Sequence, residues 1–128
     1  MTRVLLVEDS ADVLYVLQIE LEWLGYEVDA ASNAGMALEA AKRVGPDIIV
    51  SDLGMPDVDG CEFMRRVRAI PALTSVPAIA LTGATLERDI QKALAAGFTA
   101  HLVKPVDSSD LGQKIELLTS RRLQRKAG

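Results

Sequence analysis

The sequence predicts one α/β domain in which a parallel sheet is covered by helices on both faces. The length of 128 residues suits a single hydrophobic core, and a hydrophobic content of 49% excludes an intrinsically disordered chain. Short apolar runs alternate five times with segments of helical period, which is the pattern of strand–helix–strand units. Several of these runs are almost continuously apolar, as expected of strands that are buried on both faces.

The five apolar runs are predicted to form strands at residues 4–7, 28–31, 47–51, 78–81 and 99–103. Crossovers between parallel strands are right-handed, which leaves few ways to arrange five such units. We predict a flavodoxin-like three-layer sandwich with strand order 2-1-3-4-5 and five helices.

Each predicted helix has an apolar face and recognisable end signals. In the first helix, leucines and valines recur on one face between residues 13 and 24, and Gly25 ends the helix. Asn33 is the predicted cap of a second helix at 35–44, and Ser108 or Ser109 that of the fifth helix, whose apolar positions span 111–118. The third helix is expected at 62–69, and the fourth is defined by Leu86, Ile90 and Leu94.

The charge distribution argues against nucleic-acid binding. The net charge is −4 and aromatic residues make up 4% of the chain, so both a positive field and stacking side chains are scarce. Four of the fourteen basic residues lie in the last eight positions. We therefore predict a domain over residues 1–120 and a basic tail or helix end over residues 121–128.

Cysteine content and hydropathy predict a cytoplasmic protein. Cys61 is the only cysteine, so no internal disulfide can form, and no apolar stretch approaches the roughly 20 residues that span a bilayer. No signal-peptide pattern precedes the first apolar run. We expect neither secretion nor membrane insertion.

Polar side chains follow four of the predicted strands, at the sheet edge where parallel sheets bind ligands. Glu8 and Asp9 follow the first strand and Asp52 follows the third. Because strands 1 and 3 are neighbours in the predicted order, these three carboxylates converge. Two carboxylates about 5 Å apart repel by roughly 3 kcal/mol at an effective dielectric near 20, so the cluster calls for a cation.

The ligand types favour a hard divalent ion and phosphate chemistry. Carboxylate oxygens without His or Cys partners favour Mg²⁺, Mn²⁺ or Ca²⁺ over zinc, and so few carboxylates suit Mg²⁺, which often meets a phosphate. Thr82 and Lys104, which follow the fourth and fifth strands, can hold phosphoryl oxygens. With no serine, cysteine or histidine placed as nucleophile, Asp52 is the candidate phosphoryl acceptor.

Four motifs in order resemble the receiver domain of two-component response regulators, over residues 3–118. They are V-L-L-V-E-D-S at 4–10, D-I-I-V-S-D-L-G-M-P-D-V-D-G at 47–60, A-L-T-G at 80–83 and H-L-V-K-P at 101–105. Within the second motif, Met55, Pro56 and Gly60 match the family's loop after the acceptor aspartate.

The resemblance implies a metal site and a phosphoryl-binding site at these positions. Mg²⁺ would be bound by Asp9, Asp52 and the backbone carbonyl of Gly54, with Glu8 acting through water. Thr82 and Lys104 would contact the phosphoryl group, and Thr82 would move toward it on activation. The bond between Lys104 and Pro105 would be cis.

The resemblance also implies what the protein does. Asp52 would take a phosphoryl group from the phosphohistidine of a sensor kinase or phosphotransfer protein. The protein is then a phosphoacceptor that assists its own phosphorylation and dephosphorylation rather than an enzyme. Phosphorylation would reshape the face made by the fourth helix, fifth strand and fifth helix for a downstream protein, either in a single-domain regulator or in a receiver of a hybrid kinase.

One position departs from the family pattern. Where the family usually has Tyr or Phe as a switch, three residues before the lysine, this chain has His101. A modified switch role and a purely structural role for His101 both remain open.

Two alternative functions are weaker. A metal-dependent phosphotransferase of nucleotidyl-transfer type would want a D-x-D pair, whereas Asp52 is followed by Leu53 and Gly54. A flavin-binding module would need a phosphate loop after the first strand, where Glu8 and Asp9 would repel phosphate.

Other conspicuous residues are given structural roles. We expect Cys61 to be a small buried side chain and Trp23 to contribute partly to core packing. The arginines at 65, 66 and 68 are expected on the solvated side of the third helix.

Overall fold

The structure is a computed structural model that describes residues 1–55, 57–83 and 87–127, with side chains described as far as residue 120. Pro56 and Leu86 therefore lie outside the described residues. Five parallel strands form one sheet in the order β2-β1-β3-β4-β5. The strands are β1 (Arg3–Val7), β2 (Glu27–Ala31), β3 (Ile48–Asp52), β4 (Ala78–Thr82) and β5 (Ala100–Val103). The predicted fold class and strand order are confirmed.

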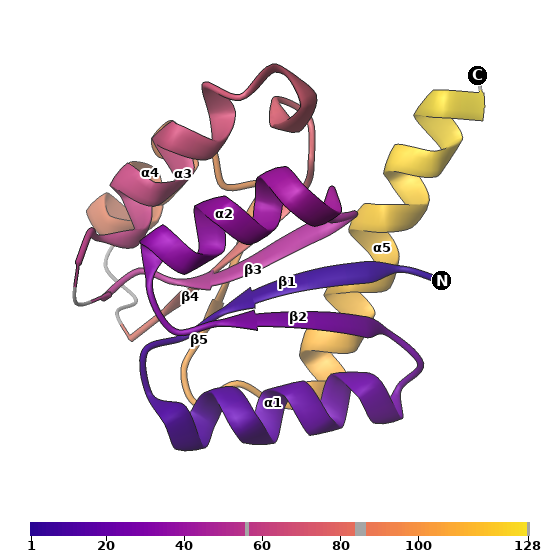
Figure 1. Ribbon diagram of the computed structural model, residues 1–128, viewed down its shortest axis with the longest axis horizontal. Helices are drawn as coiled ribbons and strands as arrows, with labels where there is room; N and C mark the ends of the chain where they lie inside the picture. The colour runs from indigo at the N-terminus through magenta and orange to yellow at the C-terminus, as the bar shows by residue number, and fades with distance from the viewer. Residues whose placement is uncertain (56, 84–86, 128) are drawn as a thin grey trace.

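Helices cover both faces of the sheet, as Figure 1 shows. On one face lie α1 (Ala11–Trp23) and α5 (Ser108–Ala127). On the other face lie α2 (Ala34–Val44), α3 (Gly60–Arg68) and α4 (Glu87–Ala96), and a 3-10 turn, η1 (Pro71–Leu73), precedes β4. The last turns of α5 project beyond the sheet, while the boundary between a domain at 1–120 and a tail at 121–128 stays a prediction. Within the described residues, no helix combines the length and the apolar character that a membrane span requires.

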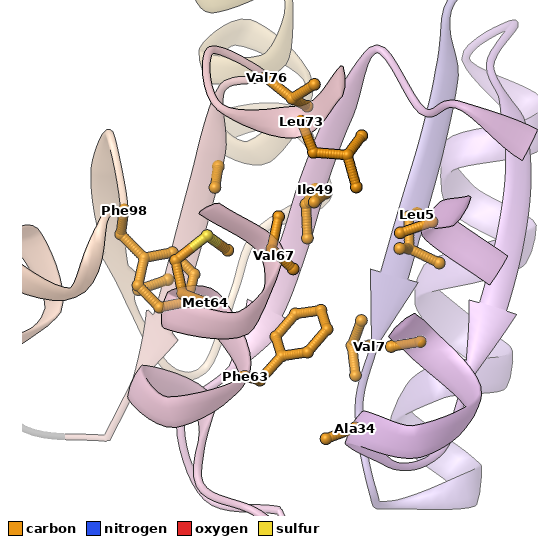
Figure 2. Close-up of a cluster of buried hydrophobic side chains, with 14 of the residues drawn as sticks. Leu5, Val7, Ala34, Ile49, Phe63, Met64, Val67, Leu73, Val76 and Phe98 are labelled. Atoms are coloured by element: carbon orange, nitrogen blue, oxygen red, sulfur yellow. The ribbon is translucent and has the colours of Figure 1, made fainter. Parts of the chain in front are cut away.

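Side chains along each strand point alternately to the two faces of the sheet and contribute to two separate hydrophobic cores. Leu5 and Val7 of β1 point toward α2 and α3, whereas Val4 and Leu6 point toward α1 and α5. In the first core, Phe63 of α3 lies beside Val7, as Figure 2 shows. Both faces of β1, β3 and β4 are buried, which explains their continuous apolar sequences.

Polar side chains fix where the helices begin. Ser10, Asn33 and Asp59 accept hydrogen bonds from backbone N–H groups in the first turns of α1, α2 and α3. At α5 the structure differs from our expectation, because Asp107 Oδ1 accepts the bond from Ser109 N at 2.7 Å. A serine therefore does not cap α5, because the residue before the helix already supplies a carboxylate.

Trp23 does not pack in the core, and the expectation for it was wrong. Its side chain is 89% exposed, and neighbouring Leu24 is 50% exposed. Leu17 and Leu21 form the buried face of α1. Since residues two apart point to different sides of a helix, burying Leu21 turns Trp23 outward.

Arg68 is also not a solvated side chain, in contrast to our expectation. Its guanidinium donates to the carbonyl of Gly97 at 3.1 and 2.7 Å and to the carbonyl of Leu73 at 2.8 Å. Burial lowers the pKa of Arg68. The side chain thus joins the end of α3 to the end of α4 and to η1.

Arg68→Ala is expected to destabilise the fold by about 2 kcal/mol, because two partly buried carbonyls lose their donor. Urea denaturation monitored by circular dichroism measures this change. Arg66→Ala is the control: Arg66 is exposed and pairs with Glu62 along the same helix at 3.1 Å, so its loss should cost less than about 0.5 kcal/mol. Equal effects of the two substitutions would contradict the role given to Arg68.

Candidate functional site

The carboxylates that follow β1 and β3 meet at one edge of the sheet. Val7 pairs with Ser51 in the sheet register, so the next residues of the two strands, Glu8 and Asp52, leave side by side. One carboxylate oxygen from each of Glu8, Asp9 and Asp52 lies within 4.8 Å of the others. The structure therefore brings together the three acids that the sequence analysis singled out.

Lys104 joins this cluster from the end of β5. Its Nζ lies 3.1 Å from Glu8 Oε1 and 3.0 Å from Asp52 Oδ1. The backbone N–H of Lys104 donates to the carbonyl of Thr82 at 2.7 Å, which fixes the ends of β4 and β5 together. The peptide bond between Lys104 and Pro105 is cis.

The polar side chains of the site differ in their exposure. Glu8, Asp52 and Thr82 are buried, whereas Asp9 is exposed and opens the cluster to solvent. The Asp52 carboxylate also accepts a hydrogen bond from Gly54 N at 3.3 Å, and the Asp9 N–H donates to Glu8 Oε2 at 3.0 Å. The buried Asp52 carboxylate thus lies next to the exposed carboxylate of Asp9.

Burial and mutual contact separate the pKa values of the two buried acids. Burial raises the pKa of Glu8 to about 7, and the hydrogen bond and charge of Asp52 act in the same direction. For Asp52, burial acts to raise the pKa, but the hydrogen bonds of Glu8, Lys104 and Gly54 outweigh it and lower the pKa. Burial acts to lower the pKa of Lys104, yet its bonds to Asp52 and Glu8 raise it. Near neutral pH, Asp52 is the ionised acid and Glu8 is partly protonated.

Metal binding should therefore depend on pH, since a cation favours the ionised form of Glu8. The Mg²⁺ affinity is expected to fall as the pH drops below about 7, the value to which the pKa of Glu8 is raised. Calorimetric titrations in buffers of different ionisation enthalpy measure both the affinity and the proton release. In Glu8→Gln the pH dependence in this range should disappear, and its persistence would show that another group titrates.

In the absence of metal, ionisation of Glu8 is expected to destabilise the folded protein, whereas it favours metal binding. The folded state holds a proton on Glu8 that the unfolded state, with a pKa near 4.5, has already released. The contribution of Glu8 to the free energy of unfolding should therefore decrease as the pH rises from about 4.5 to about 7. Urea denaturation at several pH values in the presence of a chelator measures this pH dependence. In Glu8→Gln the free energy of unfolding should lack the decrease between pH 4.5 and 7 that Glu8 causes.

The donor set fits a hard divalent cation. Its ligands are oxygen atoms only, and three carboxylates balanced by one lysine leave an excess of negative charge. A divalent cation would offset the repulsion between the negative charges of Glu8 and Asp52, which burial strengthens. When bound, such an ion neutralises charge on phosphoryl oxygens.

Gly60, at the end of the loop that follows Asp52, packs closely against the backbone of Asp52 and Leu53. Gly60 N donates to the carbonyl of Leu53 at 2.7 Å, which closes the loop. A Cβ atom on Gly60 would lie 2.6 Å from both Asp52 O and Leu53 Cα. Gly54, by contrast, has open space at the same position.

His101 lies within the edge strand β5. It is partly buried and pairs with Ala80 of β4 in the sheet register. A switch role for His101 stays a prediction.

A groove beside the acidic cluster was not found by the sequence analysis. It has a volume of about 640 Å³ and shares Glu8 and Lys104 with the site. Its walls come from α1 and from the segment after β5, and include Val13, Val16, Leu17, Pro105 and Val106. Val13 and Val16 are 42% and 51% exposed. In the sequence, the only sign of this groove is a pair of valines in the α1 segment. They can be recognised as exposed only once it is known which face of α1 packs against the sheet.

Comparison with known proteins gives consistent matches. Residues 4–116 match the model of the response regulator receiver domain. An uncharacterized 14.6 kDa protein in the sodA1 3′ region of Leptolyngbya boryana is 44% identical over 84% of this chain and 82% of its own length. The chemotaxis response regulator CheY4 of Vibrio cholerae has a TM-score of 0.88 at 33% identity, covering 92% of this chain and 98% of CheY4.

Another similar structure was solved with a bound metal ion. The receiver domain of the sensor histidine kinase PA1611 from Pseudomonas aeruginosa PAO1, solved with a magnesium ion coordinated in its active-site cleft, has a TM-score of 0.86 at 32% identity. It covers 93% of this chain and 98% of that domain.

Longer proteins match as well. The transcriptional regulatory protein TrcR of Mycobacterium tuberculosis is 33% identical over 98% of this chain, but only 49% of TrcR is covered. The chain spans about half the length of the curated transcriptional regulators that it matches.

Proposed function

The chain belongs to the response regulator receiver family, and from this membership we propose that it is a signalling switch in which Asp52 is phosphorylated. The observation that carries the proposal is the contact of a buried, ionised Asp52 with Lys104 at 3.0 Å inside a cluster of acids that suits Mg²⁺. Receiver domains interact with histidine kinases or phosphotransfer proteins. The proposed phosphoryl donor is the phosphohistidine of such a partner.

The transfer forms one bond and breaks one. A carboxylate oxygen of Asp52 forms a bond to phosphorus, while the phosphorus–nitrogen bond of the phosphohistidine breaks and its electron pair remains on the histidine nitrogen. Lys104 and the Thr82 hydroxyl hold phosphoryl oxygens and stabilise their charge. Glu8, Asp9, Asp52 and the Gly54 carbonyl are the proposed Mg²⁺ or Mn²⁺ site, Glu8 acting through water.

The groove beside the site gives the donor a place to bind. Its apolar walls lie next to Lys104, and Asp12 and Glu20 of α1 add acidic groups at its rim. A helix of a phosphodonor that covers Val13 and Val16 would bury exposed apolar surface in a groove that also includes Lys104, the residue that contacts Asp52.

The proposed output surface is the face formed by α4, β5 and α5. Among the side chains that the structure describes, these elements expose large apolar residues: Leu94 of α4 is 39%, Val103 of β5 38% and Leu117 of α5 47% exposed. Thr82 and Lys104 connect this face to the site, since they end β4 and follow β5. Phosphorylation would shift the population of an active arrangement of this face, which a downstream protein would recognise, with Thr82 and His101 as switch residues.

The proposal is tested with acetyl phosphate as a small phosphodonor. In the presence of Mg²⁺, the intact mass should increase by one phosphoryl group, and peptide mapping should locate the group at residue 52. A chelator should prevent the reaction. Absence of an adduct in the wild-type protein with Mg²⁺ present would overturn the proposed function.

A further inference from the structure

Asp57 lies in the loop between β3 and α3 and accepts three backbone hydrogen bonds. Its Oδ1 accepts from Ala34 N at 3.0 Å and from Val58 N at 2.9 Å, and its Oδ2 accepts from Gly35 N at 3.0 Å. Ala34 and Gly35 form the first turn of α2, more than twenty residues earlier in the chain. One carboxylate therefore connects the loop to a different helix.

These contacts complete the N-terminus of α2. The first N–H groups of a helix have no partner within the helix, and the Asn33 side chain accepts from Met36 N at 2.9 Å. Asp57 accepts from the two preceding N–H groups. Those bonds lower the pKa of Asp57, with the bond from Ala34 contributing most, so the group is a carboxylate near neutral pH.

The same loop contains Gly54, three residues before Asp57. The loop is closed at its ends by the bond from Gly60 N to the Leu53 carbonyl, and Leu53, Met55 and Val58 pack against the core between α2 and α3. Apolar packing is non-directional, whereas two hydrogen bonds to adjacent N–H groups fix an orientation. Asp57 supplies this directional connection for the middle of the loop.

We propose that Asp57 is a positioning residue for the metal site, which holds the loop against the N-terminus of α2 and thereby holds the Gly54 carbonyl in place. This inference rests on the proposed function, because it assigns that carbonyl to Mg²⁺ binding. Coupling between two sites is reciprocal, so Mg²⁺ binding should in turn strengthen the contacts of Asp57 with α2.

The first test measures Mg²⁺ affinity by isothermal titration calorimetry. Asp57→Ala is expected to weaken binding by about tenfold, the lower end of the range for residues that support metal ligands. Asn33→Ala is the matched control, since the acceptor that it removes is bonded to Met36 N within the same turn of α2. It should lose comparable thermal stability but retain the wild-type Mg²⁺ affinity.

The second test follows the coupling itself, in a readout that a purely structural role would not change. In the wild-type protein, saturation with Mg²⁺ should slow amide hydrogen exchange at Ala34 and Gly35, as measured by NMR. Asn33→Ala should keep this response and Asp57→Ala should lose it. Asp57→Asn, which keeps one acceptor oxygen, should give a smaller response than the wild type.

The outcomes separate this inference from the proposed function. If the wild-type protein does not bind Mg²⁺, the proposed function is wrong and the inference falls with it. If the wild type binds Mg²⁺ and Asp57→Ala binds as tightly as Asn33→Ala, the positioning role is wrong while the proposed function stands. Should Asp57→Ala fail to fold, Asp57→Asn takes its place, and an unchanged affinity in that variant overturns the inference.

Discussion

Asp52→Asn is expected to abolish covalent phosphorylation by acetyl phosphate. The carboxamide is not a nucleophile of the required kind, and the neighbouring Ser51 hydroxyl already donates to the Asp52 carbonyl at 2.9 Å. Raising the Mg²⁺ concentration should not restore the reaction, because the substitution removes the proposed acceptor atom itself. Intact-mass measurement at saturating Mg²⁺ and acetyl phosphate is the experiment.

Asp9→Asn provides the informative contrast within the same cluster. It removes a proposed Mg²⁺ ligand that is exposed at the opening of the site but leaves Asp52, the proposed acceptor, in place. Its phosphorylation should be slow at low Mg²⁺ and should recover at high Mg²⁺. Asp110→Asn, in the first turn of α5, should behave as the wild type. An undiminished adduct in Asp52→Asn would show that another residue is the acceptor.

Gly60→Ala is expected to destabilise the protein by about 3 kcal/mol and to slow phosphorylation as well. The added Cβ would lie 2.6 Å from Asp52 O and from Leu53 Cα, and both are backbone atoms that cannot rotate away. Relief of this clash requires movement of the main chain of the proposed acceptor residue. Urea denaturation and the rate of acetyl phosphate labelling measure the two effects.

Gly54→Ala is the control for the same loop. A Cβ atom there meets nothing within 4 Å, and the backbone φ of Gly54 is not positive. The added methyl group meets no clash, so the stability should stay close to that of the wild type. If Gly60→Ala were as stable as Gly54→Ala, the close approach at Gly60 would not constrain the loop.

The sequence alone determined the fold class and the membership of the acidic cluster. Continuous apolar runs separated by helical periodicity predict a parallel sheet, and the crossover rule then restricts the strand order. Once β1 and β3 are neighbours, the residues after them must meet, since the carboxyl ends of parallel strands share one edge. Glu8, Asp9 and Asp52 therefore needed no coordinates to be placed together.

Only the tertiary structure decided what surrounds these residues. Asp57 and Arg68 form hydrogen bonds with backbone groups of other elements. Almost every residue carries the same backbone N–H and carbonyl groups. The sequence therefore contains no residue pattern that would reveal these partners. The exposure of Trp23 likewise depends on which side of α1 meets the sheet. Hydrophobic periodicity and strand-end chemistry are local and readable along the chain, whereas partners of the main chain and the rotation of a helix are fixed by packing between distant segments.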